Sequence, residues 1–134
     1  MQAIKEILLA DLDEVYSSIV AANNREGRVM TRRQICDIIS KSPAPRLYIT
    51  PEYAMRILRG HPRCGARTHS YRVAAMQQEM RSRVLALPEN QRSLADIAKA
   101  IAEPAQSFYL SSRRIYDFLY QVYNRRKQSP SSID

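Results

Sequence analysis

The chain of 134 residues has only three glycines, two cysteines and no tryptophan. So few glycines leave no Gly-rich phosphate loop. Two cysteines make no disulfide framework, and in a reducing compartment we expect both to stay thiols. No apolar run approaches the roughly 20 residues that a bilayer-spanning helix needs, and the acidic, amphipathic start does not resemble a signal peptide. We therefore expect a soluble cytoplasmic protein that does not enter a membrane.

Patterns typical of catalysis and metal binding are also scarce. No serine lies in a nucleophile elbow, and no close pair of carboxylates is evident. His61, Cys64 and His69 lie within one short segment, but their spacing fits no familiar zinc pattern, and the fourth ligand would have to be distant Cys36. We interpret this segment as a polar loop, and we predict no catalytic activity, no metal and no cofactor.

The basic residues are almost all arginine. The net charge is +8, and 17 of the 21 basic residues are arginines. Residues 1–24 sum to −3, so the rest of the chain carries +11. Arginine presents a planar fork that grips a phosphate or a guanine edge with two hydrogen bonds. This bias favours a nucleic-acid partner, and the alternatives are a solvated basic surface or a site for an acidic protein.

Apolar periodicity predicts an all-α protein with six helices. The expected helices are residues 2–23, 31–41, 51–60, one after a cap at Ser70, 93–101, and one after a cap at Ser111 or Ser112. Thr31 with Gln34 resembles a capping box, and Ser93 with Asp96 has the same spacing. Prolines after residues 41 and 103 stop the second and fifth helices.

The two halves of the chain resemble each other. "EVYSSIVA" (14–21) aligns with "EMRSRVLA" (79–86), "TRRQICDII" (31–39) with "SLADIAKAI" (93–101), and "PAPRLYIT" with "PAQSFYLS". Three matches in the same order favour an internal duplication of a three-helix unit. We predict a first unit over 1–60, a basic linker over 61–69, a second unit over 70–126, and a disordered tail over 127–134.

Each half has a long first helix, a short capped second helix, a turn, and an amphipathic third helix with exposed arginines. This order resembles the tri-helical helix-turn-helix class of DNA-binding domains, as two tandem copies. The resemblance implies that each third helix enters the major groove while the others brace it. One departure is the turn: "KSPAPRLYI" and "AEPAQSFYL" are about twice the usual three or four residues.

These two turns look like rigid connectors. Pro-Ala favours extended backbone, while Leu47 with Ile49, and Phe108 with Leu110, can alternate inward. Tyr48 and Tyr109 then point outward or to the rim. Each hydroxyl either contacts a DNA phosphate, or belongs to a half-buried ring and bonds a nearby carbonyl.

Candidate DNA contacts avoid the apolar stripes. Most gather near the predicted starts of the second and third helices, and others lie in the basic linker and at the end of the last helix. They are Arg32, Arg33, Arg46, Tyr48, Thr50, Glu52, Arg56, Arg59, Arg63, Arg67, Tyr109, Ser112, Arg113, Arg114, Arg125 and Arg126.

The two candidate third helices begin differently, with "TPEY" and "SSRR". We therefore hypothesise that the first unit grips the backbone and the second reads bases.

The function that this pattern favours is sequence-preferring binding of double-stranded DNA, as a regulator or a mobile-element accessory factor. The alternative is a small helical adaptor that binds an acidic protein partner. The acidic helix expected over residues 2–23 is a candidate homodimer face.

Overall fold

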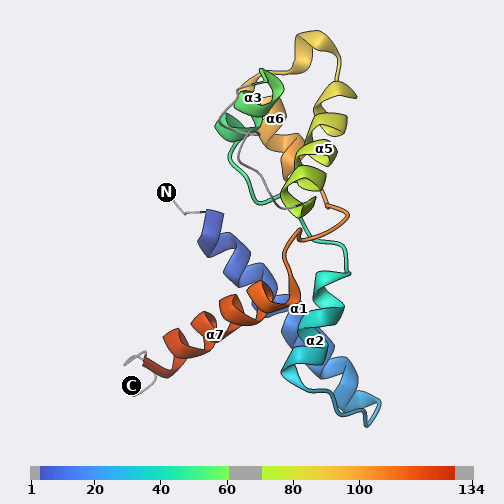
Figure 1. The fold of residues 1–134 in the computed structure, drawn as a ribbon, viewed down its shortest axis with the longest axis vertical. Helices are drawn as coiled ribbons and strands as arrows, with labels where there is room; N and C mark the ends of the chain where they lie inside the picture. Colours follow the sequence, from blue (N-terminus) through green and yellow to red (C-terminus); the bar gives the residue numbers. More distant parts are fainter. Residues whose placement is uncertain (1–3, 61–70, 129–134) are drawn as a thin grey trace. The chain divides into compact units, whose positions relative to one another are not determined.

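A computed structural model describes residues 4–60 and 71–128 of the chain. These residues contain six α-helices: α1 (Ile4–Arg25), α2 (Arg32–Ser40), α3 (Pro51–Leu58), α5 (Tyr71–Leu85), α6 (Leu94–Ile101) and α7 (Ser112–Gln128). A short 3-10 helix, η1 (Glu89–Gln91), was not predicted. The described residues form no strand, so the all-α prediction is confirmed (Figure 1).

The helix starts follow the capping residues that the sequence indicates. The Thr31 hydroxyl accepts a hydrogen bond from the Gln34 N–H at 3.1 Å, and the Gln34 side chain accepts one from the Thr31 N–H at 2.8 Å. Ser93 and Asp96 form the same reciprocal pair at the start of α6. These bonds satisfy backbone donors that a helix start leaves without partners. Both predicted capping boxes are therefore confirmed.

The helices form two compact units, and these units do not coincide with the sequence halves 1–60 and 70–126. Unit 1 comprises Met1–Lys41 with Leu110–Asp134, and unit 2 comprises Ser42–Tyr109. In unit 1, α7 contacts both α1 and α2; in unit 2, α3 contacts both α5 and α6 (Figure 1). Each unit thus combines two helices from one half of the sequence with the third helix from the other half.

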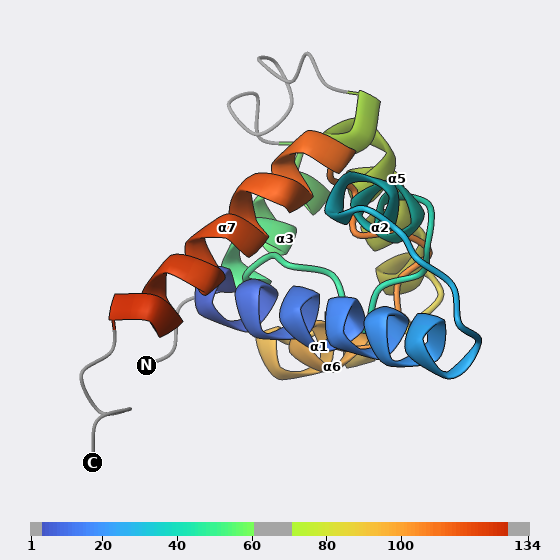
Figure 2. The same ribbon diagram turned by 90° about the horizontal axis from the view of Figure 1, so that it is seen from below.

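Unit 1 buries one apolar stripe from each of its helices. Leu12 of α1, Ile39 of α2 and Ile115 of α7 are fully buried. Figure 2 shows the last turns of α7 beside the first turns of α1, where Arg125 donates to Glu6 at 2.9 Å. Burial of these stripes is the main stabilising contribution that a small helical unit has.

Unit 2 contains both predicted connectors, and they pair with each other. Ala44 and Ala105 exchange two backbone hydrogen bonds of 2.9 and 2.8 Å, which make an antiparallel bridge. The rings of Tyr48 and Phe108 stack with their centroids 5.8 Å apart. The segment from Ala44 to Ala105 is therefore closed at its two ends, and the recurring Pro-Ala pattern marks the place of closure.

The connectors are held against unit 2 by apolar side chains. Leu47, Ile49 and Phe108 are buried as predicted, whereas Leu110 is only half-buried. The Leu47 N–H also donates to the Ile101 carbonyl at 2.9 Å. These contacts explain why a turn twice the usual length can be ordered.

Candidate nucleic-acid interface

The starts of α2 and α7 bring arginines from distant parts of the chain together. The Ser111 hydroxyl accepts the Arg114 N–H at 3.1 Å, so Ser111 caps α7, and Arg113 and Arg114 lie in the first turn. The Arg33 guanidinium lies over the Tyr116 ring, 5.8 Å from its centroid. Arg33, Ser112, Arg113, Tyr116 and Asp117 together line a hollow of about 390 Å³.

This arrangement corrects the hypothesis that the two sequence halves supply separate backbone-gripping and base-reading units. Arg32 and Arg33 were expected to grip from one unit, with Arg113 and Arg114 reading bases from another. All four lie in unit 1, because α7 packs on α2. The connector that follows α2 makes this possible, since it leads the chain into α3 of unit 2 and not back onto α2.

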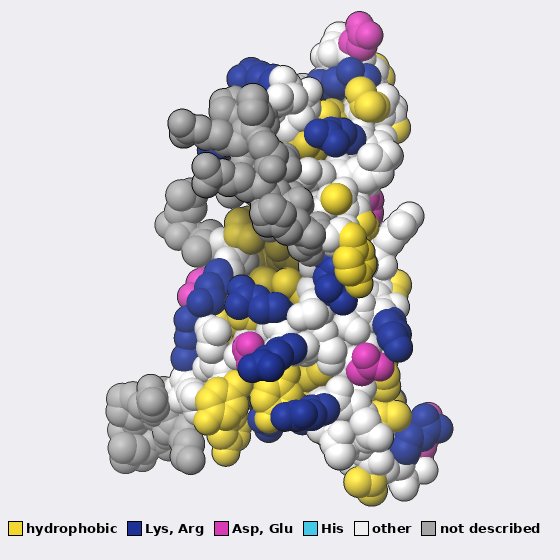
Figure 3. Space-filling view, in the orientation of Figure 1, with side chains coloured by type: hydrophobic (Ala, Val, Ile, Leu, Met, Phe, Trp, Pro, Cys, Tyr) yellow, Lys and Arg dark blue, Asp and Glu magenta, His cyan; other side chains and the backbone are white. Residues whose placement is uncertain are grey.

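The two faces of α7 differ in chemistry. Ile115, Phe118 and Leu119 are buried, whereas Arg113, Arg114, Asp117 and Tyr120 are exposed. Figure 3 shows basic side chains interspersed with hydrophobic ones over the part of unit 1 that contains α7. Such a face combines positive charge with aromatic surface, which suits phosphates and bases as well as protein partners.

Contacts between guanidinium groups and aromatic rings hold this face in place. Arg32 lies over the Tyr123 ring at 5.5 Å, and Arg114 lies over the Phe118 ring at 4.7 Å. A cation over an aromatic face is attracted by the ring quadrupole while its N–H groups stay available at the edge. The guanidinium groups are therefore oriented without being neutralised.

Arg125 and Arg126, near the end of α7, have acidic partners inside unit 1. Arg125 pairs with Glu6 at 2.9 Å, and Arg126 pairs with Asp13. These two pairs fasten α7 to the acidic helix α1. They also partly neutralise the surface that the sequence offered as a candidate homodimer face.

The remaining predicted contacts lie in unit 2 or outside the described residues. The Thr50 hydroxyl accepts the Tyr53 N–H at 3.1 Å and so caps α3. The side chains of Glu52, Arg56 and Arg59 are exposed, while Arg46 and Tyr48 of the first connector are half-buried. Arg63 and Arg67 lie outside the described residues.

Tyr109 belongs to a polar cluster that the sequence did not reveal. Its hydroxyl donates to the Glu79 carboxylate, so its bonding partner is a carboxylate and not the predicted carbonyl. Burial, together with the Glu79 hydrogen bond, raises the pKa of Tyr109 to about 12. Its φ of 57° is rare for a residue with a side chain, and the bond from its N–H to the Ser107 hydroxyl at 2.8 Å supports that conformation.

Glu79 and Arg83 organise the rest of this cluster. Arg83 donates to the carbonyls of Ala100 and Glu103 at 2.9 Å each, and also to the Pro104 carbonyl. It pairs with Glu79 at 2.5 Å, and their side chains are only 17% and 11% exposed. The spacing of Glu79 and Arg83, four residues apart on α5, was a visible signal of a helical ion pair. Their role in holding the second connector was not visible.

The described part of the chain has neither a metal-binding cluster nor a membrane-spanning helix. No group of three or more His, Cys, Asp or Glu side chains there is placed to hold a metal ion. His61, Cys64 and His69 lie outside it, and Cys36 is a buried free thiol. No helix within residues 4–60 and 71–128 is long and apolar enough to cross a bilayer.

Comparisons of the chain with protein-family models, with curated proteins and with solved structures give no match.

Proposed function

We propose that the protein binds double-stranded DNA with a preference for sequence, and that α7 of unit 1 is the helix that enters the major groove. The observation that carries this proposal is the exposed start of α7, where Arg113 lines one hollow with Arg33 of α2 and Arg114 is exposed in the same turn of α7. An α-helix fits the major groove, and arginine there binds the O6 and N7 atoms of guanine with two hydrogen bonds.

The dimensions and composition of unit 1 suit this task. The 17 residues of α7 give a helix about 25 Å long, and its opposite face is fixed by burial against α1 and α2. Arg32 and Arg33 occupy the first turn of α2, where the positive end of the helix dipole adds to their attraction for phosphate. In this proposal α2 positions the protein on the backbone and α7 reads bases.

The second candidate function is an adaptor that binds an acidic protein. Tyr120 and Tyr123 of α7 are 50% and 49% exposed. Tyrosine and arginine are enriched at the centres of protein interfaces, so the same surface suits such a partner. The two functions differ in their dependence on salt, because only DNA binding releases many condensed counterions.

The test uses the full chain and fluorescence anisotropy on random and enriched duplexes. If about six phosphates are neutralised, affinity should fall roughly a thousandfold between about 50 and about 200 mM salt. The double substitution Arg113→Ala and Arg114→Ala should cost about 1–3 kcal/mol for each base-reading hydrogen-bonded pair that it removes, and it should flatten sequence preference. A salt-insensitive interaction would favour the adaptor.

The matched control is Arg56→Ala with Arg59→Ala, which removes two exposed arginines from unit 2. We expect a smaller decrease in affinity that is equal for all sequences. Equal effects of the two double variants on sequence preference would contradict the assignment of base reading to α7.

A further inference from the structure

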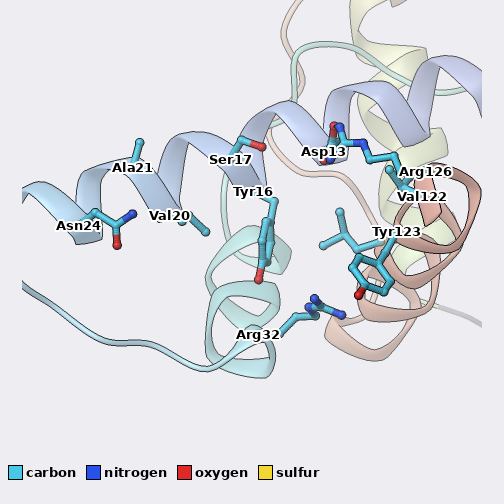
Figure 4. Close-up of a pocket in the computed structure, with 11 residues that line it drawn as sticks. Asp13, Tyr16, Ser17, Val20, Ala21, Asn24, Arg32, Val122, Tyr123 and Arg126 are labelled. Atoms are coloured by element: carbon cyan, nitrogen blue, oxygen red, sulfur yellow. The ribbon is translucent and has the colours of Figure 1, made fainter. Parts of the chain in front are cut away.

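A groove of about 300 Å³ lies in unit 1 where α1, the start of α2 and α7 meet (Figure 4). Its apolar lining includes Val20, Leu119 and Val122, and its polar lining includes Tyr16, Arg32 and Tyr123. Small-molecule sites usually have apolar walls with a few convergent polar groups. The volume of this groove is at the lower end of the range for such sites.

Arg32, at the start of α2, is one of three charged residues that line the groove. Figure 4 shows Tyr16 of α1 and Tyr123 of α7 pointing toward it. The neighbouring Tyr16 hydroxyl, as a hydrogen-bond acceptor, raises the pKa of the Arg32 guanidinium, which also lies over the Tyr123 ring. Both partners are tyrosine side chains, and within the described residues no carboxylate pairs with Arg32.

The other charges of the groove cancel each other. Asp13 and Arg126, which also line it, form an ion pair. Among the described residues that line the groove, Arg32 is therefore the positive charge that no carboxylate offsets. A bound anion would supply the missing negative charge. Because the walls beside Arg32 are apolar, an inorganic anion would leave most of them in contact with water.

We propose that this groove binds a small organic carboxylate with an apolar body. The carboxylate accepts two hydrogen bonds from the planar fork of Arg32, and the Tyr16 hydroxyl lies beside it. The apolar body lies against Val20, Leu119 and Val122. A ligand bound there neutralises Arg32, next to Arg33 and the exposed start of α7. It therefore lowers affinity for phosphate, and this last step rests on the proposed DNA binding.

The experiment follows backbone and side-chain resonances of the full chain by heteronuclear NMR as hydrocinnamate is added. For a ligand of this size we expect saturable shifts at Tyr16, Arg32 and Tyr123, with a dissociation constant on the order of 1 mM. Hydrocinnamide has the same shape without the charge, and we expect it to bind at least about tenfold more weakly. Equal affinity of acid and amide, or no saturable binding of the acid, would overturn the proposal.

Two neighbouring arginines provide a matched pair of variants. Arg32→Gln should weaken hydrocinnamate binding about tenfold or more, whereas Arg33→Gln, which lies outside the groove, should leave it unchanged. Unchanged binding by a folded Arg32→Gln variant contradicts the site. If that variant does not fold, Tyr16→Phe replaces it, with an expected decrease of about threefold, and unchanged binding again contradicts the site.

The link to DNA is measured separately. Saturating hydrocinnamate, but not hydrocinnamide, should weaken duplex binding by the full chain. Ligand binding without any DNA binding would leave the groove assignment intact and remove the proposed function. DNA binding that hydrocinnamate does not weaken would remove the regulatory step alone.

Discussion

Several arginines of unit 2 hold backbone segments together, whereas those at the helix starts of unit 1 lie over aromatic rings. Arg83 donates to three carbonyls at the end of α6, and Arg92 donates to the Leu87 carbonyl at 2.8 Å, near the end of α5. In unit 1, the guanidinium groups of Arg32, Arg33 and Arg114 lie over aromatic rings instead. Carbonyl contacts use up the guanidinium donors, while ring contacts leave them available.

Because of this difference, the number of arginines alone is a poor predictor of nucleic-acid binding. Part of the excess stabilises turns and helix ends in unit 2, and Arg125 and Arg126 serve ion pairs in unit 1. The basic side chains that still favour DNA are a smaller set, concentrated at the starts of α2 and α7.

The largest expected effect is a difference in DNA affinity between unit 1 and unit 2 when each is produced separately. Ala44 and Ala105 are a hydrogen-bonded antiparallel pair, which a two-residue Asn-Gly turn can close. Replacing residues 45–104 with Asn-Gly should therefore leave a folded unit 1 that keeps its DNA affinity within about threefold. The fragment Ser42–Tyr109 should bind about a hundredfold more weakly or worse.

Circular dichroism melts establish that both proteins fold, and anisotropy then compares their affinities. Comparable affinities of the two folded fragments would remove the functional difference between the units. Loss of binding by a folded unit 1 would show that unit 2 contributes to the interface.

The next largest effect concerns the stability of unit 2. Arg83→Ala removes the cation that pairs with the mostly buried Glu79 carboxylate, and with it the side-chain donor to three carbonyls. Breaking such a pair costs about 3 kcal/mol in free energy of unfolding. Arg81→Ala is the matched control on the same helix, because the hydrogen bond from Arg81 to the Ile57 carbonyl is long, at 3.4 Å. We expect it to cost less than about 1 kcal/mol. Urea unfolding measures both, and equal costs would contradict the special role of Arg83.

The sequence allowed the helices to be predicted, because their determinants are local. The capping boxes at Thr31 and Ser93, the Thr50-Pro51 start and the apolar spacing each act within a few residues. The partner of each third helix could not be predicted. The apolar stripes around Ile57 and Ile115 are alike, so either could pack on either pair of first and second helices. The connectors decide the outcome, and their pairing joins residues about sixty positions apart.

The residues of the candidate interface could be predicted from the sequence, but not which of them lie together in space. Arg33 and Arg113 were both identified, yet their common hollow requires α7 to pack on α2. The groove around Arg32 has the same cause, since its walls come from three helices of unit 1. Local patterns carry no information about such long-range neighbours.

A smaller effect is the coupling between Arg33 and Arg113 in DNA binding, which a double-mutant cycle measures. Because Arg33 and Arg113 line one hollow, their effects on DNA binding should couple by about 0.5 kcal/mol or more. Arg56 lies in unit 2, so Arg56→Ala with Arg113→Ala should be additive within about 0.5 kcal/mol. Anisotropy titrations of the single and double variants give both values. If the effects of the Arg33 and Arg113 substitutions are additive, the two arginines act independently in DNA binding.

The smallest effect is a pH dependence confined to unit 2. Because the folded protein holds the pKa of Tyr109 at about 12, above the ordinary value of about 10, the neutral phenol contributes stability that is complete below about pH 10. This contribution disappears as the pH rises through the folded pKa. A phenolate at this position would be partly buried, would have no proton to donate and would face the negative Glu79 carboxylate. The free energy of unfolding of the wild type should therefore fall more steeply between about pH 10 and about pH 12 than that of Tyr109→Phe. Tyr71→Phe, which changes a tyrosine that is 71% exposed, should follow the wild-type curve. Parallel curves for wild type and Tyr109→Phe would show that the Glu79 contact does not depend on the tyrosine proton.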